Sequence, residues 1–139
     1  MNELEEGLRL ELDFGKLAAV AATGAQVVPV VLQDADSNEV LFVGYANETA
    51  LRASLDEGIA VLWSTSRNEL WRKGATSGDT LALVEVRVNC EQNSLLYRVR
   101  PTTGGACHTK LPSGQARRSC YYRAIGDEGA LRPVPGLYD

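Results

Sequence analysis

Short runs of β-branched and apolar residues, each closed by turn-forming residues, constrain the fold of this chain more than any other feature. Five such runs occur, at residues 27–32, 40–45, 59–63, 81–88 and 95–99. A cluster of Asp, Ser and Asn separates the first two runs, and the run at 81–88 alternates along its length. Because β-branched residues favour extended backbone whereas Asp, Ser and Asn favour turns, the pattern predicts strands joined by turns.

A single strong helix signal interrupts these strands. Asn47 precedes residues 48–57, in which Ala50, Leu51 and Leu55 share one face, and Gly58 follows. Asn is a good helix N-cap and Gly a good stop, so we expect an N-capped helix here. Residues 2–24 give only a weak strand or helix signal. The expected fold class is therefore α/β of the α+β kind, a small mixed sheet with few helices.

The chain reads as one domain over residues 1–139. A chain of this length can bury a core without a metal or disulfide. No apolar run approaches the length of a membrane span, so we expect no membrane partner. The first residues are acidic and unlike a secretory signal, which favours a cytoplasmic location. In a reducing compartment the three cysteines are expected to be free thiols, thiolates or metal ligands.

Charge is unevenly distributed along the chain. Residues 60–123 hold ten Lys and Arg against four acids, which leaves four bases and fourteen acids elsewhere. This asymmetry suggests that the middle of the chain faces an anion, although a solvated strand edge would also use such residues. Aromatic residues are only 6% of the chain and basic residues form no run, so we expect a phosphorylated small molecule rather than nucleic acid.

The polar, Gly- and Pro-rich segment 101–120 holds the groups best suited to chemistry. His108, the only histidine, stands beside Cys107, while Cys120 ends the segment and Cys90 follows the strand at 81–88. Three thiolates with an open fourth position could hold a zinc ion that lowers the pKa of a water to about 7, with His108 as a nearby proton carrier. From spacing alone, buried structural cysteines with a surface histidine, or a Cys–His nucleophile, remain open.

Several motifs, read in chain order, resemble those of one enzyme family. Residues 45–51 read Y-A-N-E-T-A-L, residues 63–78 read W-S-T-S-R-N-E-L-W-R-K-G-A-T-S-G, residues 106–108 read A-C-H and residues 117–123 read R-R-S-C-Y-Y-R. Over residues 10–125 the chain strongly resembles phosphoribosyl-AMP cyclohydrolase, an enzyme of histidine biosynthesis.

The resemblance implies an intertwined homodimer that hydrolyses the N1–C6 bond of the adenine ring in 1-phosphoribosyl-AMP. It implies a zinc ion held by Cys90, Cys107 and Cys120 at the subunit interface, with His108 assisting the attacking water. Charge and resemblance together give the candidate substrate-binding residues: Trp63, Ser64, Arg67, Trp71, Lys73, Thr76, Ser77, Glu91, Arg117 and Arg118. The two tryptophans could equally serve in packing, and the turn that Gly74 and Gly78 flank could cradle phosphate or simply be tight.

The chain departs from the family's pattern around its first cysteine. Where the resemblance implies Asp-Cys-Asp-x-Asp and a magnesium ion, this chain has Asn89, Glu91 and Asn93. Magnesium favours carboxylate oxygens, so we expect this site to be severely weakened. Thr65, Ala75 and Leu81 also replace usual residues, and extra residues occur around 111–114.

Two readings of function therefore remain open from the sequence. The first is a zinc-dependent cyclohydrolase acting on phosphoribosyl-AMP or on a related, phosphorylated N-heterocycle. The second is a non-catalytic zinc-binding interaction protein that kept the fold.

Overall fold

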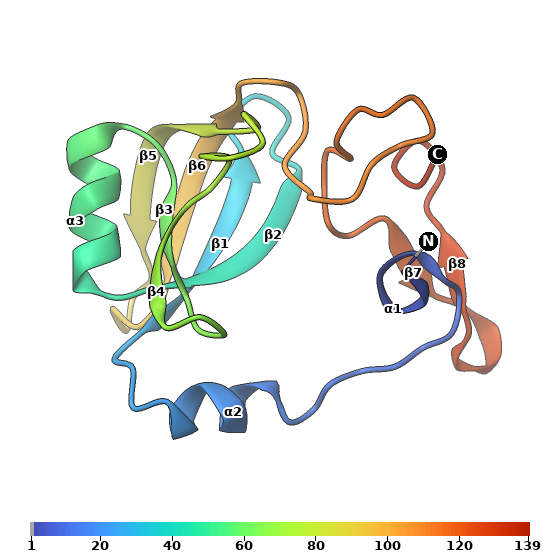
Figure 1. The fold of residues 1–139 in the computed structure, drawn as a ribbon, viewed down its shortest axis with the longest axis horizontal. Coiled ribbons are helices and arrows are strands. Elements are labelled where there is room, and N and C mark those ends of the chain that lie inside the picture. The colour runs from blue at the N-terminus through green and yellow to red at the C-terminus, as the bar shows by residue number, and fades with distance from the viewer. Residues whose placement is uncertain (1) are drawn as a thin grey trace.

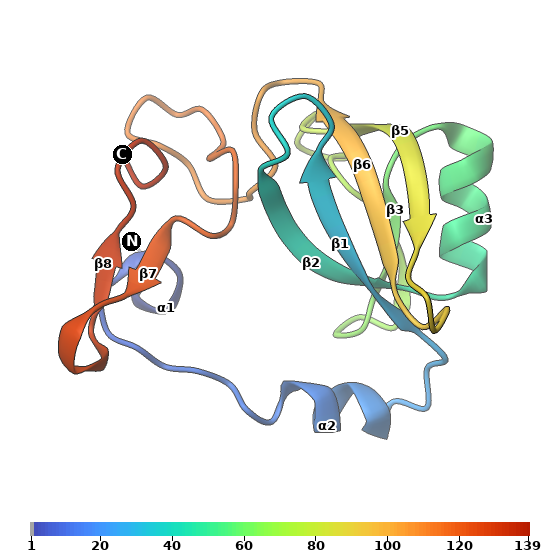
Figure 2. The same ribbon diagram turned by 180° about the vertical axis from the view of Figure 1, so that it is seen from behind.

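A four-stranded mixed sheet forms the larger part of the molecule. The computed structural model describes residues 2–139. The sheet has the order β2-β1-β6-β5. Its strands are β1 (Val28–Asp34), β2 (Val40–Ala46), β5 (Leu81–Val88) and β6 (Leu95–Pro101). The central pair β1–β6 is parallel, and the two outer pairs are antiparallel (Figures 1 and 2). The expected α+β class with a small mixed sheet is confirmed.

Helix α3 (Glu48–Glu57) and the hairpin of β3 (Val61–Ser64) and β4 (Glu69–Arg72) complete this part. The helix has the predicted bounds, since Asn47 Oδ1 accepts a hydrogen bond from Ala50 N at 2.9 Å and Gly58 ends it in the left-handed region at φ 71°. The hairpin lies behind the sheet in Figure 2. Leu62 and Tyr97 are fully buried in the core between them.

The chain's two ends meet in a smaller lobe beside the sheet (Figure 1). This lobe contains α1 (Glu3–Glu6), β7 (Arg123–Ile125), the 3₁₀ turn η1 (Asp127–Gly129) and β8 (Leu131–Pro133). Helix α2 (Lys16–Ala22) and the extended residues before it run from the small lobe to the sheet. Residues 2–24, ambiguous in the sequence, thus form two short helices.

Three strands were not expected from the sequence: β4, β7 and β8. Each is three or four residues long and largely polar or exposed, so it shows no period-two burial pattern. Each exists because a neighbouring strand supplies its backbone partners, which a local pattern cannot reveal. Among residues 2–139, no helix is long and apolar enough to cross a membrane.

Candidate active site

Two of the three cysteines lie together where the long loop closes on itself. Ala106 N and Cys107 N both donate to Arg117 O, at 3.1 and 3.0 Å, and Cys120 N donates to Leu41 O on β2 at 2.7 Å. The loop can close this tightly only because Gly105 lacks a side chain: a Cβ there would lie 2.3 Å from Ala116 O. The main chain therefore fixes Cys107 and Cys120 against each other and against the sheet.

The two thiols are coupled electrostatically. A hydrogen bond from the Cys120 thiol lowers the pKa of Cys107 to about 5, and hydrogen bonds from Thr109 contribute in the same direction. The same bond, together with burial, raises the pKa of Cys120. Thr109 Oγ1 lies 3.1 Å from Cys107 Sγ. The pair thus favours one thiolate at neutral pH, the form in which cysteine binds metals.

His108 lies at the junction of two cavities. A small cavity of about 130 Å³ is lined by His108, both thiols and residues of the small lobe. The second cavity, of about 440 Å³, is more polar and lies beside β4 and the following turn. Six residues predicted from the sequence line it: Arg67, Trp71, Lys73, Thr76, Ser77 and His108. The structure therefore brings these six together next to the Cys107–Cys120 pair.

A partly buried charge cluster that includes Lys73 adjoins this cavity. The Lys73 side chain is buried, with Nζ donating to Asp79 O at 3.3 Å, and burial lowers its pKa. The Asp79 carboxylate accepts hydrogen bonds from Thr103 Oγ1 at 2.5 Å and Lys110 Nζ at 3.2 Å, which lower the pKa of Asp79. Two lysines with one carboxylate leave net positive charge here, which suits an anionic ligand.

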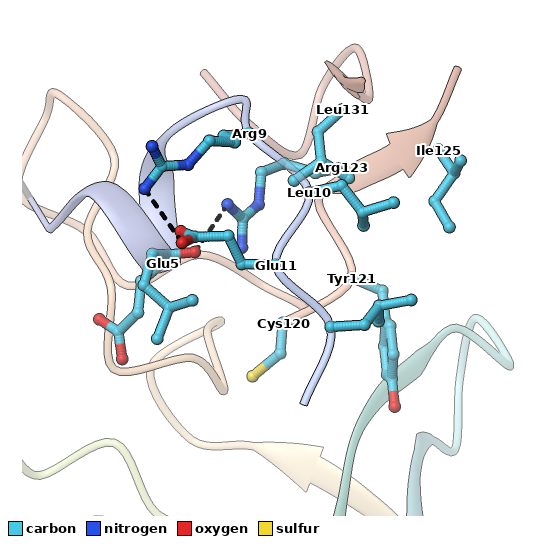
Figure 3. Close-up of a pocket in the computed structure, with 11 residues that line it drawn as sticks. Glu5, Arg9, Leu10, Glu11, Cys120, Tyr121, Arg123, Ile125 and Leu131 are labelled. Carbon is cyan, nitrogen blue, oxygen red and sulfur yellow. Dashed lines mark hydrogen bonds and ion pairs between the residues drawn. The ribbon is translucent and has the colours of Figure 1, made fainter. Parts of the chain in front are cut away.

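A third cavity, of about 520 Å³, lies on the other side of Cys120 (Figure 3). Its lining is mostly apolar and comes from the small lobe, including Leu10, Tyr121 and Ile125. Its charged groups, Glu5, Arg9, Glu11 and Arg123, include both signs, and none of the residues predicted to bind substrate lines it.

Cys90 and Glu91 lie elsewhere, at the tip of the β5–β6 hairpin. Cys90 is exposed there. Among residues 2–139, no three His, Cys, Asp or Glu side chains gather closely enough to hold a metal ion. Asn89 Oδ1 accepts from the backbone of Asn93 and Ser94 at 2.9 Å, Asn89 Nδ2 donates to Asn93 Oδ1 at 2.7 Å, and Asn93 Nδ2 donates to Glu91 Oε2 at 3.3 Å.

Of four further candidates, three have partners within the chain. Arg117 is buried, pairs with Glu6 at 2.7 Å and stacks on Tyr122, 4.4 Å from its ring centre. Arg118 pairs with Glu39 at 3.2 Å. The remaining two belong to β3: Ser64 Oγ accepts from Arg67 N at 3.2 Å, and the indole Nε1 of Trp63 is buried without a partner among the described residues. Their roles in substrate binding stay predictions.

The sequence reading missed the groups that surround the thiols and His108. Glu5 Oε1 lies 2.7 Å from His108 Nε2, and Thr109, Asp79 and Lys110 make the contacts given above. Asp79 had a weak signal, as one of few acids in a basic stretch. Glu5 had none, because it stands in an acidic segment far from His108 in sequence.

Comparisons with known proteins show which proteins this chain is similar to. The family model described as phosphoribosyl-AMP cyclohydrolase matches residues 42–122. A protein of that name from Sphingopyxis alaskensis is 47% identical over 107 residues, which cover 77% of this chain and 79% of that protein. Another from Haloarcula marismortui is 48% identical over 103 residues, covering 74% and 80%. A third, from Halobacterium salinarum, is 43% identical over 120 residues, covering 86% and 87%.

Proposed function

Because the chain belongs to the phosphoribosyl-AMP cyclohydrolase family, we propose that it hydrolyses 1-phosphoribosyl-AMP at the N1–C6 bond of the adenine ring. The family membership that the motifs indicated is confirmed. The observation that carries the proposal is the junction at His108, where a cationic cavity meets a pair of coupled thiols. In the reaction, the oxygen of water joins C6, the N1–C6 bond breaks, and N1 takes up a proton.

The cavity beside β4 supplies what a nucleotide with two phosphates requires. Arg67 and Lys73 offer positive charge, and Thr76 and Ser77 offer hydroxyls and backbone N–H groups. Charge-assisted hydrogen bonds of this kind are the strong ones for phosphate recognition. The Trp71 indole, 38% exposed and packed on Phe42, presents a flat surface to the same cavity. We infer that it stacks on a ring of the substrate.

The donor set around Cys107 fits zinc. Cys107 and Cys120 would supply two thiolates, and among the described side chains of one chain no third His, Cys, Asp or Glu gathers with them closely enough to hold a metal ion. Cys90, exposed on the hairpin tip, is free to reach the corresponding pair of a second copy. We therefore propose a homodimer in which Cys90 of one copy completes the site of the other. Bound zinc would supply Lewis acidity that activates water for attack.

His108 is placed to move the proton of this reaction. Its ring lines both the cavity that would hold the substrate and the cavity that holds the thiols. A general base must lie within hydrogen-bond reach of the water whose proton it takes, and the position of His108 between the two cavities supports this role. The protonated ring can then deliver the proton to N1 as the bond breaks.

Magnesium is not part of the proposed mechanism. The amide groups of Asn89 and Asn93 hydrogen bond to each other, and Glu91 is the only carboxylate at this tip. Amides lack the charge by which carboxylates attract a doubly charged ion. We propose that the hairpin folds and functions without this cation.

The function is tested by following ring opening of 1-phosphoribosyl-AMP with the purified protein and measuring its zinc by elemental analysis. We expect hydrolysis, about one zinc per chain, and loss of activity when zinc is chelated. Zinc-loaded protein without hydrolysis of this substrate would favour the non-catalytic zinc-binding alternative.

A pair of inactive variants tests the shared site. Cys90→Ser and Cys107→Ser should each abolish activity alone. When the two are co-expressed, random pairing of subunits should restore about one quarter of wild-type activity, because half of the dimers then hold one intact site of two. Co-expression of Cys107→Ser with Cys120→Ser is the matched control and should restore none. Recovery in the control, or none in the first pair, would contradict the shared site.

A further inference from the structure

Helix α1 is held to the small lobe by hydrogen bonds to its own carbonyl groups. A helix of four residues leaves its main-chain carbonyls without helical partners, so other groups must satisfy them. Tyr122 Oη donates to Glu5 O at 2.5 Å and Tyr138 Oη donates to Glu6 O at 2.7 Å. Arg123 donates to Leu4 O at 3.0 Å and Gly7 O at 2.8 Å. These bonds fix the position of α1 without using the Glu5 carboxylate.

The Glu5 carboxylate is therefore free for another contact, and it points to His108. Glu5 Oε1 lies 2.7 Å from His108 Nε2, and both side chains line the small cavity with Cys107 and Cys120. The Glu5 side chain is 35% exposed, against 71% for His108. The less exposed carboxylate is thus the fixed partner, and the imidazole is the group that gains order from the contact.

The other carboxylates of α1 do not share this position. Glu6 is directed to Arg117, at 2.7 Å, and this pairing lowers the pKa of Glu6. Glu3 makes no side-chain hydrogen bond or ion pair within the described part of the chain. Residues 2–7 also lie outside the stretch that the family model matches, residues 42–122.

We propose that Glu5 is a positioning residue that fixes the orientation and tautomer of His108 for the hydrolytic reaction. This inference rests on the proposed function for the role of His108. An ionised carboxylate can only accept a hydrogen bond, so His108 must donate through Nε2–H, and the neutral ring then carries its lone pair on Nδ1.

The consequence for the reaction is a defined path for one proton. Nδ1 takes the proton from the attacking water while Nε2–H remains bound to Glu5. The resulting imidazolium is stabilised by the adjacent Glu5 carboxylate. The proton then leaves from Nδ1 to N1 of the substrate. Partners that orient an imidazole in this way typically contribute about 10- to 100-fold to activity.

The test compares the full-length wild type with Glu5→Gln, with Glu3→Gln as the matched control. Both substitutions remove one carboxylate from the same short helix. A glutamine amide can turn to donate or to accept, so it cannot impose one tautomer. We expect kcat of Glu5→Gln to fall about 10- to 100-fold with KM changed less than about twofold, and Glu3→Gln to match the wild type. Glu5→Asp should recover part of the lost kcat. Thermal stability should be equal in all variants, because Tyr122 holds the Glu5 carbonyl.

A second readout does not depend on activity. His108 is the only histidine, so its two ring nitrogens give one set of ¹⁵N signals, which report the tautomer directly. We expect an Nε2-protonated ring in the wild type and a mixture in Glu5→Gln. An unchanged kcat, or the same ¹⁵N pattern in both proteins, would overturn the proposal. A wild type that does not hydrolyse 1-phosphoribosyl-AMP would instead remove the proposed function, and the ¹⁵N comparison would still decide the role of Glu5.

Discussion

The turn after β4 offers two glycines that differ in only one physical respect. Gly74 and Gly78 both lie in the left-handed region, at φ 82° and φ 84°. A Cβ at Gly78 would meet nothing within 4 Å, whereas a Cβ at Gly74 would lie 2.3 to 2.5 Å from main-chain atoms of Asp79 and Thr80. Alanine at either position therefore carries the same backbone strain, and only alanine at Gly74 adds a clash.

The expected costs follow from these distances. Left-handed backbone costs a residue with a side chain about 1–2 kcal/mol, which is the full effect expected for Gly78→Ala. At Gly74 the approach is more than about 1 Å too close, since carbon atoms pack at about 3.5–4 Å. The neighbours are main chain, so the turn must open, at a further cost of about 1–3 kcal/mol. We expect a total loss of about 2–5 kcal/mol for Gly74→Ala.

The consequence for function depends on Thr76 and Ser77, the residues of this turn that line the cavity beside β4. Gly74 directly follows Lys73. Gly78 N donates to Gly74 O at 2.8 Å and so closes the turn that contains Thr76 and Ser77. An opened turn displaces the hydroxyls from the cavity, so KM should rise about tenfold or more in Gly74→Ala and little in Gly78→Ala.

Urea denaturation, thermal unfolding and steady-state kinetics of both variants test these expected losses of stability and changes of KM. The thermal midpoint should fall by about 3–4 °C for each kcal/mol lost in a chain of this size. Equal stability loss and equal KM in the two variants would show that the clash at Gly74 is absent and that the turn does not position the substrate.

Two further predictions concern charge. Wild-type activity should be nearly independent of added magnesium. The triple variant Asn89→Asp, Glu91→Asp, Asn93→Asp should bind magnesium in a calorimetric titration. Strong magnesium activation of the wild type would refute the prediction that this hairpin tip has lost its magnesium site. Asp79→Asn should lose about 2 kcal/mol of unfolding free energy at pH 7 by urea denaturation. Because the pKa of Asp79 is lowered from 3.8 on folding, its stabilisation is present above about pH 4 and is lost as pH falls through the lowered pKa, so the difference in stability between variant and wild type should shrink below about pH 4.

The sheet and helix α3 were predictable because their signals are local. The runs at 81–88 and 48–57 have the same bounds in the structure, and Asn47 and Gly58 cap the helix as their residue types require. The parallel pairing of β1 with β6 was not predictable, since no local pattern encodes which strands lie side by side. The same holds for the small lobe, in which α1 contacts residues near the other end of the chain, as where Tyr138 donates to Glu6 O.

In the candidate site, too, local signals were predictable and long-range contacts were not. The motif at 63–78 is contiguous, and five of the binding residues predicted within it line one cavity together with His108. The sequence predicted Arg117 as an anion ligand as strongly as these residues. Its position beside Glu6 and Tyr122 depends on a contact between opposite ends of the chain. The contact of Glu5 with His108 could not be predicted for the same reason, because it also joins distant parts of the chain. Sequence reasoning therefore found the residues that bear charge or thiols, and missed the partners that orient them.

The replaced residues at the hairpin tip and the retained thiols have one physical explanation. Three carboxylates in one tight turn repel one another unless a cation lies between them. Here Asn89 instead accepts hydrogen bonds from the backbone of Asn93 and Ser94, and its amide group donates to Asn93. Bonds of the two amide side chains therefore close the turn, and Glu91 is its only carboxylate. Cys90 is exposed within this turn, so in the proposed dimer a hairpin without magnesium would still present the third thiol to a second copy of the chain.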